Sequence, residues 1–264
     1  MTHKTMNKLF ITLALGASCA SLSCAAVSAE SQDATAPVSD VTPQTTARIL
    51  GNMEHLRGFQ GTGFNFIAEV IGVENGAASE QHKLEVKISE QGYALVEVLE
   101  PKNQRGRRTL LRERDLWLYL PSSANVIRIA PLQRVFGAAS IADVLNVSYL
   151  SGYTVESSRT AADGKLLKLN LKSKDADSSF ARIEVDYDLA ADRPIESRHY
   201  TASSRLLKTI QYKTFYNYGG NPKVEKIVIV DGIRKSSAVW MKMGQYSRAT
   251  YPDAMFAKAS LPGK

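Results

Sequence analysis

The chain has 264 residues, of which 44% are hydrophobic, and it carries a formal net charge of +7. This length suits one large β domain or two small ones and leaves ample room for a buried core. The modest positive charge permits contact with anionic lipid headgroups, but it does not by itself require a nucleic acid as partner.

The N-terminal segment has the pattern of a cleaved signal peptide. Lys4 and Lys8 precede an apolar run from Leu9 to Gly16, and Val27-Ser28-Ala29 supplies the small residues of a signal-peptidase site. The apolar run is shorter than the ~20 residues that a membrane-spanning helix needs. We therefore predict that residues 1–29 are removed and that the mature protein is periplasmic. Cleavage removes two lysines and no acidic residue, so the net charge falls from +7 to +5.

Both cysteines, Cys19 and Cys24, lie within this N-terminal segment. Cys24 offers the alternative of a lipidated N-terminus. However, Leu22 stands two positions before Cys24, whereas a lipobox has its large aliphatic residue three positions before the cysteine. If cleavage follows Ala29, the mature chain contains no cysteine, and thiol chemistry and cysteine-ligated metals are excluded.

The mature chain begins with a polar leader and then a helix. Residues 30–41 are rich in Ser, Thr, Ala, Asp and Pro, a composition that predicts disorder. Thr42 and Pro43 have the pattern of an N-cap followed by proline at the first helical position. Apolar residues then recur at helical spacing, at Ile49, Leu50, Met53 and Leu56. We therefore predict an amphipathic helix from Thr42 to Arg57, ended by Gly58.

From Thr62 onward the chain is predominantly β. His82 to Ile88 and Arg182 to Leu189 alternate apolar and polar residues almost ideally, and Asn75-Gly76 and Asp163-Gly164 are hairpin signals. The whole region contains about eleven candidate strands at a spacing typical of a sandwich or barrel. No domain boundary is visible among these strands, so we predict a single domain over residues 42–264.

One strand, Leu116 to Leu120, is apolar on both faces. Alternation places its leucines on one face and Trp117 and Tyr119 on the other, so both faces need a cover. The segment that follows, Leu132 to Leu150, is rich in apolar residues, contains a predicted short helix from Ile141 to about Val147, and is the candidate cover for the Trp117–Tyr119 face. Ordinary core packing and a closed apolar cavity explain the apolar surplus equally well.

The sequence contains few candidates for chemistry. The histidines form no HxH or HExxH pair, so we expect no metal site and surface positions for His82 and His199. There is also no G-x-S-x-G elbow, P-loop or dinucleotide fingerprint. Glu184 and Asp186 share a strand face and could serve acid–base chemistry, but their regular alternation favours a solvated face. We therefore expect neither a cofactor nor catalysis.

A basic run extends through the loop from Pro101 to Arg108 and on to Arg114. Two interpretations of this run compete. Its arginines could bind anionic headgroups or an acidic partner. An exposed hairpin loop without a partner is the favoured alternative, because the loops of a basic protein collect such charge.

The central motifs resemble those of a known family. A strand that reads L-W-L-Y-L-P, from Leu116 to Pro121, is followed by a short strand at Ile127 to Ile129. Gln133-Arg134 and the segment Gly137 to Asp143 come next, before the predicted helix. This order resembles the outer-membrane lipoprotein-sorting proteins of the LolA-like superfamily, in its TP-0789-like branch.

The resemblance covers nearly the whole mature chain. Weaker matches lie at Arg57-Gly58, Arg193-Pro194, Leu206 to Tyr212 and Tyr251-Pro252-Asp253, with Phe256 and Leu261. Ala138 and Ala139 depart from the pattern, because the family more often has a Ser-Asp pair there. A polar role for that loop is therefore not implied.

The resemblance implies a mainly β fold with few helices, in which a strongly curved antiparallel sheet forms an incomplete barrel lidded by helices. It implies a non-enzymatic periplasmic carrier or accessory protein that binds acyl chains of lipids or lipoproteins in a concave apolar cavity. The role would be outer-membrane lipoprotein sorting or lipid transport. An inner-membrane transporter or an outer-membrane acceptor would be a partner, contact with the membrane would be transient, and nucleic acid would not bind. The alternative is a non-catalytic periplasmic sensor or adaptor that binds a partner protein through the same half-barrel.

The residues of the acyl-chain site follow from this interpretation. We expect the chain to be lined by Val96, Val98, Trp117, Tyr119, Leu132, Phe136, Ile141, Val144, Leu145 and Tyr149. The helix that begins at Ile141 would serve as a lid. Arg128 and Arg134 at the rim would meet a phosphate or carboxylate headgroup, or a partner.

Overall fold

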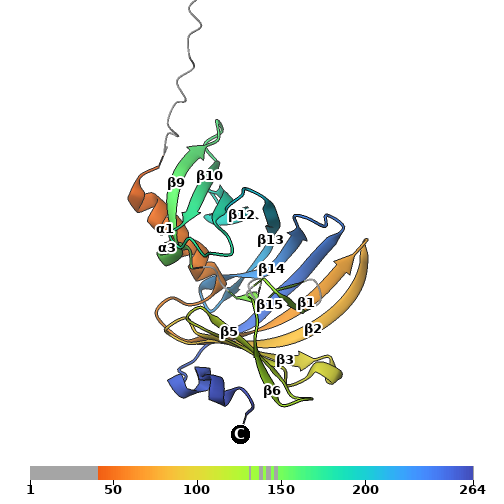
Figure 1. The fold of residues 1–264 in the computed structure, drawn as a ribbon. Coiled ribbons are helices and arrows are strands. Elements are labelled where there is room, and N and C mark those ends of the chain that lie inside the picture. The colour runs from red at the N-terminus through yellow and green to blue at the C-terminus, as the bar shows by residue number, and fades with distance from the viewer. Residues whose placement is uncertain (1–40, 131, 137–138, 141–143, 146–147, 264) are drawn as a thin grey trace, which may run out of the picture. The chain divides into compact units, whose positions relative to one another are not determined.

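The computed structural model describes residues 41–130, 132–136, 139–140, 144–145 and 148–263 (Figure 1). Within these residues the α-helices are α1 (Pro43–Arg57) and α3 (Tyr149–Gly152), and the 3-10 helices are η1 (Lys102–Gln104), η2 (Asp253–Phe256) and η3 (Lys258–Ser260). The strands are β1 (Phe64–Glu74), β2 (Ala77–Ile88), β3 (Ala94–Glu100), β4 (Arg108–Arg112), β5 (Asp115–Leu120), β6 (Asn125–Arg128), β7 (Arg134–Phe136), β8 (Ala139–Ser140), β9 (Tyr153–Thr160), β10 (Leu166–Ser173), β11 (Arg182–Asp188), β12 (Arg193–Tyr200), β13 (Leu206–Tyr218), β14 (Asn221–Asp231) and β15 (Ser237–Arg248).

The first helix forms where its sequence predicts it. Thr42 is the N-cap, and its Oγ1 accepts a hydrogen bond from the backbone N–H of Thr45 at 3.2 Å. Proline at the first helical position costs no hydrogen bond, because that N–H has no partner within a helix. The apolar positions face the sheet and are buried, from Ile49 to Leu56. The predicted amphipathic helix is confirmed.

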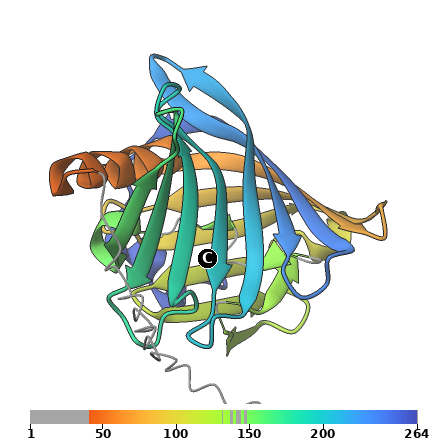
Figure 2. The ribbon, with the colours of Figure 1, turned by 90° about the horizontal axis from the view of Figure 1, so that it is seen from above.

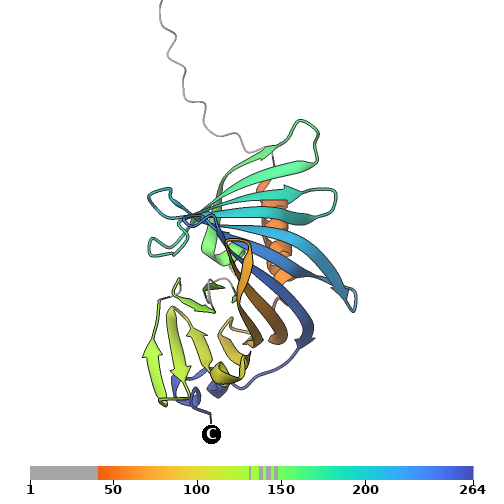
Figure 3. The ribbon, with the colours of Figure 1, turned by 90° about the vertical axis from the view of Figure 1, so that its right-hand side faces the viewer.

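Thirteen strands form one antiparallel sheet in the order β6-β5-β4-β3-β2-β1-β15-β14-β13-β12-β11-β10-β9. The first and last strands of the chain, β1 and β15, pair in the middle of this order. The strands at its two ends, β6 and β9, do not pair with each other, so the sheet stays open. Figures 2 and 3 show how strongly it curves. The predicted fold class, an incomplete antiparallel barrel with few helices, is confirmed.

The concave face of the sheet carries most of the hydrophobic core. On one half, Ile49 and Met53 of α1 pack with the buried side chains of β10 and β11. On the other half, Val144 and Leu145 pack with Val96 and with the concave residues of β1, β14 and β15. Two separate covers therefore lie on the concave face, one helical and one from the segment that follows β8.

The aromatic face of β5 has a different cover from the expected one. Trp117 and Tyr119 pack with Phe256 and Leu261 of the C-terminal segment, which lies beside β5 and β6 in Figure 1. The ammonium of Lys258 lies 3.9 Å from the centroid of the Trp117 ring. The concave core, with Val144 and Leu145, instead takes the leucine face of β5. The expected cover is thus corrected, because the end of the chain returns to the aromatic face.

The two histidines expected at the surface are buried instead: His82 is 1% exposed and His199 is 0% exposed. Strand alternation explains both positions. His82 lies on the buried face of β2 together with Leu84, and its neighbour Lys83 points to the other face. His199 likewise points inward from β12, opposite to Arg198. On these two strands the charged neighbour points to the solvent, so the histidine next to it in sequence points to the buried face.

The predicted helix from Ile141 to about Val147 lies mostly outside the described residues. The structure does describe Val144 and Leu145 within it, and both are buried. Across the described part of the chain, no helix has both the length and the apolar character needed to span a membrane.

Candidate functional site

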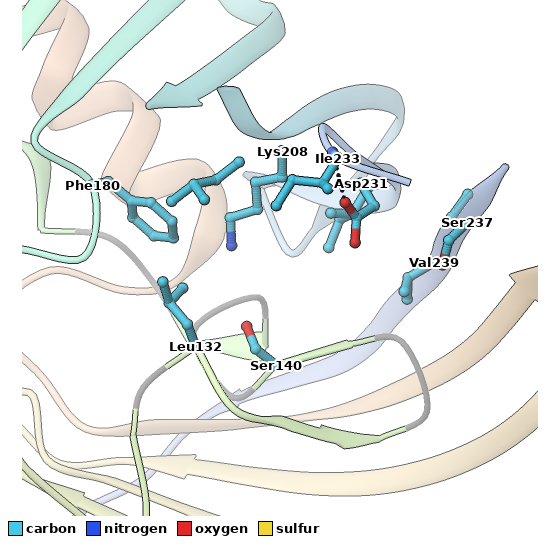
Figure 4. A pocket seen from close by; sticks show the side chains of 11 residues that line it. Leu132, Ser140, Phe180, Lys208, Asp231, Ile233, Ser237 and Val239 are labelled. Carbon is cyan, nitrogen blue, oxygen red and sulfur yellow. Dashed lines mark hydrogen bonds between the residues drawn. The ribbon is translucent and has the colours of Figure 1, made fainter. Parts of the chain in front are cut away.

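A pocket of about 230 Å³ opens on the concave face, between Leu132 and Ser140 on one side and strands β13, β14 and β15 on the other (Figure 4). We call it the concave pocket. Its lining consists of Leu132, Ser140, Phe180, Leu207, Lys208, Ile229, Asp231, Ile233, Ser237, Ala238 and Val239. Apolar side chains predominate among these residues, and the polar ones are few, a composition typical of sites that bind apolar ligands.

Strand register brings the pocket residues together from distant parts of the sequence. Lys208 of β13 lies opposite Asp231 of β14, and Ile229 of β14 lies opposite Val239 of β15. Alternation turns Lys208 to the concave side, where its side chain is only 7% exposed. The connection between β10 and β11 supplies Phe180 on the opposite wall.

A lysine ammonium lies inside this largely apolar pocket. Lys208 Nζ is 4.4 Å from the centroid of the Phe180 ring, a distance at which a cation is attracted to the aromatic face. Figure 4 shows the ammonium pointing toward the space between Phe180, Leu132 and Ser140. The carboxylate of Asp231 also lines the pocket, so the pocket combines a mainly apolar lining with one positively and one negatively charged side chain.

Ser237 of β15 adds a hydroxyl group to the lining of the concave pocket. Its side chain is 3% exposed, and its Oγ has no hydrogen-bond partner among the described residues. A buried hydroxyl without a partner costs about 1–3 kcal/mol. An oxygen atom of a bound molecule would remove this cost.

His199 forms the wall behind Phe180. The two rings meet edge to face, with centroids 4.8 Å apart, and His199 Nε2 lies 3.0 Å from Ser197 Oγ. Burial, together with the positive charges of Lys208 and Arg57, holds the pKa of His199 well below its ordinary value. The imidazole is therefore neutral at neutral pH and adds no charge to this wall.

The structure brings together some of the predicted acyl-chain residues. Val96, Val98, Val144 and Leu145 share the main concave core. Leu132 lines the concave pocket and is 40% exposed. These residues lie on the face that the acyl-chain hypothesis requires.

The other predicted residues lie elsewhere. Tyr149 packs in the cluster around α1, and Trp117 and Tyr119 lie on the opposite face of β5, against the C-terminal segment. Arg128 is exposed at the sheet edge and forms an ion pair with Asp115. Three predictions fall outside what the structure describes, namely the side chains of Arg134 and Phe136, and residue Ile141 as a whole.

Sequence reasoning missed Phe180, Lys208, Ile229 and Ser237 as pocket residues. For Lys208 a signal was present, because it shares its strand face with Ile210 and Tyr212 and so interrupts an apolar row. For Phe180 and Ser237 no local pattern pointed to the pocket. Their proximity depends on the curvature of the sheet.

The carboxylates of Glu184 and Asp186 belong to a half-buried ion network on the convex face. Arg198 bonds Glu184 at 3.1 Å and Asp186 at 3.0 Å. Burial alone would raise the pKa of Glu184, but hydrogen bonds from Arg182, Tyr200 and Arg198 lower it. These hydrogen bonds thus favour the ionised form of the Glu184 carboxylate. Among the described residues no group of three or more His, Cys, Asp or Glu side chains could hold a metal ion.

The fold has close structural counterparts. A LolA superfamily protein from Nitrosomonas europaea superposes with a TM-score of 0.71 at 23% identity, over 83% of this chain and 99% of its own. A DUF1329 family protein from Desulfovibrio piger gives 0.68 at 16% identity, over 83% and 98%. A domain named for outer membrane lipoprotein sorting, from Vibrio parahaemolyticus, gives 0.66 at 18% identity, over 83% and 97%. The protein thus has the LolA-like fold.

The sequence also matches a protein family. Residues 90–262 match a family described as uncharacterized-protein-like, and no curated protein matches the chain. The chain therefore belongs to that family. The resemblance to the LolA-like proteins is confirmed for the fold.

Proposed function

We propose that this protein is a periplasmic carrier or accessory protein that binds acyl chains of lipids or lipoproteins on the concave face of its sheet. The observation that carries the proposal is the concave pocket, whose mainly apolar lining also contains the ammonium of Lys208 and the carboxylate of Asp231. An acyl chain matches the apolar part of this lining, and the ammonium of Lys208 matches an anionic group at the polar end of the ligand. The LolA-like fold supports the proposal, because a solved protein with this fold is named for lipoprotein sorting.

The size of the concave pocket limits what it holds unaided. At about 230 Å³ it is smaller than the ~300–1,000 Å³ of typical ligand pockets. A full acyl chain would therefore also take the space that Val144 and Leu145 fill over Val96 and Val98. Burial of ~14 carbons at ~0.8 kcal/mol per methylene approaches ~10 kcal/mol before the cost of ordering the chain.

The polar end of the ligand has two proposed sites. Lys208 and Ser237 offer an ammonium and a hydroxyl inside the concave pocket. Arg128 offers a guanidinium at the rim, on the exposed edge strand β6, where it now pairs with Asp115. Because that pair is exposed, it contributes little stability and exchanges readily for a phosphate or carboxylate.

Native mass spectrometry of the protein purified from its own periplasm tests the proposal directly. We expect a lipid or lipoprotein adduct on the full chain. A lipid-free protein in stable complex with a partner protein would contradict the carrier role and favour the sensor or adaptor alternative.

A pair of tryptophan variants tests the position of the site. Ile229→Trp fills the concave pocket, and we expect it to weaken binding of a fluorescent fatty-acid probe by about tenfold or more, because it displaces about two methylenes of the ligand. Thr209→Trp is the matched control, since Thr209 is half-buried on the opposite face of β13. Circular dichroism checks that both variants fold. Equal probe affinity in the two folded variants would exclude this pocket as the site.

A further inference from the structure

The convex face of the sheet carries an exposed tryptophan at its centre. Trp240 is 58% exposed and lies on β15, the middle strand of the thirteen. Strand register places Val228 and Ile71 directly beside it. The next row of the same face has Val230, Ala238 and Val73. We call Trp240 and the four branched residues Ile71, Val73, Val228 and Val230 the convex patch.

Lysines border the convex patch on one side. The adjacent row across four strands consists of Lys226, Lys242, Glu69 and Lys83, in register. Lys226 and Lys242 are exposed, and neither forms an ion pair with any described residue. Glu69 lies within the row, and Glu100 of β3 lies opposite Lys83 at its end. Three lysines therefore stand beside two glutamates, and the net charge is +1.

A second exposed aromatic side chain lies beyond the lysines. Tyr216 is 56% exposed and lines a shallow hollow of about 210 Å³ together with Lys242 and the carboxylates of Glu69 and Glu225. The convex surface therefore presents Trp240 and Tyr216 on either side of its basic row. Tryptophan and tyrosine are the side chains that gather at the headgroup level of membranes, and lysine interacts favourably with anionic lipid there.

We propose that the convex patch and its lysine row are a docking surface for an anionic phospholipid bilayer. Trp240 enters the headgroup region, and Lys226, Lys242 and Lys83 meet lipid phosphates. Strand β15 lies at the middle of a strongly curved sheet (Figure 3), so the bulge of the convex face can touch a flat bilayer while the concave face remains accessible. This surface is separate from the concave pocket.

The charges argue against a second copy of the chain as the occupant. A symmetric dimer through this face would bring Lys226 and Lys242 of both copies together, and like charges facing each other across an interface disfavour association. Anionic lipid, by contrast, complements the lysine row.

Co-sedimentation of the full chain with phosphatidylglycerol vesicles tests the proposal, with phosphatidylcholine vesicles for comparison. We expect binding to the anionic vesicles and a large loss of binding in 0.5 M salt. Lys226→Gln combined with Lys242→Gln should weaken binding on the order of thirtyfold, from the usual effect of a lysine at an anionic surface. The matched control is Lys102→Gln with Lys165→Gln, which removes the same charge from exposed positions outside the row.

Tryptophan emission locates the contact. Subtracting the emission spectrum of Trp240→Phe from that of the unmodified chain gives the emission of Trp240. This emission should shift to shorter wavelength when anionic vesicles are added. Trp240→Ala should weaken sedimentation by about tenfold or more, whereas Ile195→Ala, at a residue 46% exposed on β12, should not.

Four results would overturn the proposal. They are absence of binding to anionic vesicles, equal loss in the two lysine pairs, an unchanged Trp240 emission on bound vesicles, and concentration-dependent dimerisation that Trp240→Ala abolishes. The fatty-acid probe distinguishes membrane docking from acyl-chain binding. The lysine and Trp240 variants should bind the probe as the unmodified chain does.

Discussion

At the scale of single residues, Lys223 shows how burial changes the chemistry of a side chain. Its side chain is 0% exposed. Its ammonium donates a hydrogen bond to the backbone oxygen of His55 at 2.7 Å and lies 4.4 Å from the centroid of the Phe59 ring. Lys223 thereby caps the last turn of α1, where carbonyl groups lack partners within the helix. Burial, and to a lesser degree the charge of Arg248, lower the pKa of Lys223 to about 8.

This shift predicts a dependence of stability on pH. Between pH 8 and the ordinary lysine value of 10.5, the unfolded chain keeps a proton that the folded protein has released. The unfolded state then binds more protons, so the free energy of unfolding rises with pH in this window, by at most ~3 kcal/mol. Urea unfolding at pH 7.5, 8.5 and 9.5 should show this rise.

Lys223→Met provides the control for the pH dependence. The rise should disappear in this variant, although its stability at one fixed pH also reflects the lost hydrogen bond. Measurements stop at pH 9.5 because burial raises the pKa of Tyr187 and Tyr246 in the folded protein. At higher pH the unfolded chain therefore loses these protons first, and the free energy of unfolding falls. An identical slope in both proteins would show that Lys223 does not titrate in this window.

At the scale of elements, the C-terminal segment, residues 251–261, packs against the convex face of β3, β4 and β5. Phe256 is 0% exposed and packs with Leu110 and Trp117. Arg108 donates a hydrogen bond to the backbone oxygen of Leu261 at 3.2 Å, and Arg112 pairs with Asp253 at 3.1 Å. Without this segment the aromatic face of β5 would be open to solvent.

Two substitutions compare how much the aromatic packing and the ion pair of this segment contribute to stability. Phe256→Ala should lower the free energy of unfolding by ~3–5 kcal/mol, because it leaves a cavity under the segment. Asp253→Ala should cost less than ~1 kcal/mol, since its pair with Arg112 is partly exposed. Chemical denaturation of both variants measures the difference. Similar losses in the two variants would mean that the ion pair contributes as much as the aromatic packing, which would contradict this prediction.

At the scale of the whole molecule, the open and curved sheet allows two different surfaces to coexist. Its concave side is covered by α1 and by the segment that contains Val144 and Leu145. Its convex side is exposed around Trp240. A sheet closed into a complete barrel would enclose one interior, whereas the edges β6 and β9 of this open sheet are not paired with each other and could adjust to the proposed ligand.

Ligand binding should therefore stabilise the whole fold. A fatty acid at 100 times its dissociation constant should raise the free energy of unfolding by ~2.7 kcal/mol if it binds only the folded state. Thermal unfolding with and without the fatty acid measures this gain. The gain should persist in Thr209→Trp and be lost in Ile229→Trp. A gain in neither the parent chain nor the control would argue against acyl-chain binding by the folded protein.

Local patterns predicted the elements well. Thr42, Pro43 and the apolar spacing up to Leu56 defined α1 almost to the residue. Strict alternation predicted β2 and β11, since a two-residue period assigns every side chain to a face. The same alternation places His82 and His199 on the buried face of their strands. We expected both at the surface because their neighbours in sequence are charged.

The sequence predicted only some of the residues that meet on the concave face. Val96, Val98, Val144 and Leu145 meet on the concave face as expected. Trp117 and Tyr119 do not join them, because residues about 140 positions later in the chain cover that face. Lys208 and Phe180 become neighbours through long-range register and curvature, which no local window of sequence contains.

The sequence by itself determined the mainly antiparallel β architecture, the first helix and the presence of a strand, Leu116 to Leu120, that must be covered on both sides. These properties follow from periodicity and capping, which act between residues close in the chain. Only the tertiary structure decided which segment covers which face, where the concave pocket lies and that Trp240 stands exposed on the convex side. Those properties depend on how thirteen strands curve together, and the curvature is a collective result of twist and packing across the whole sheet.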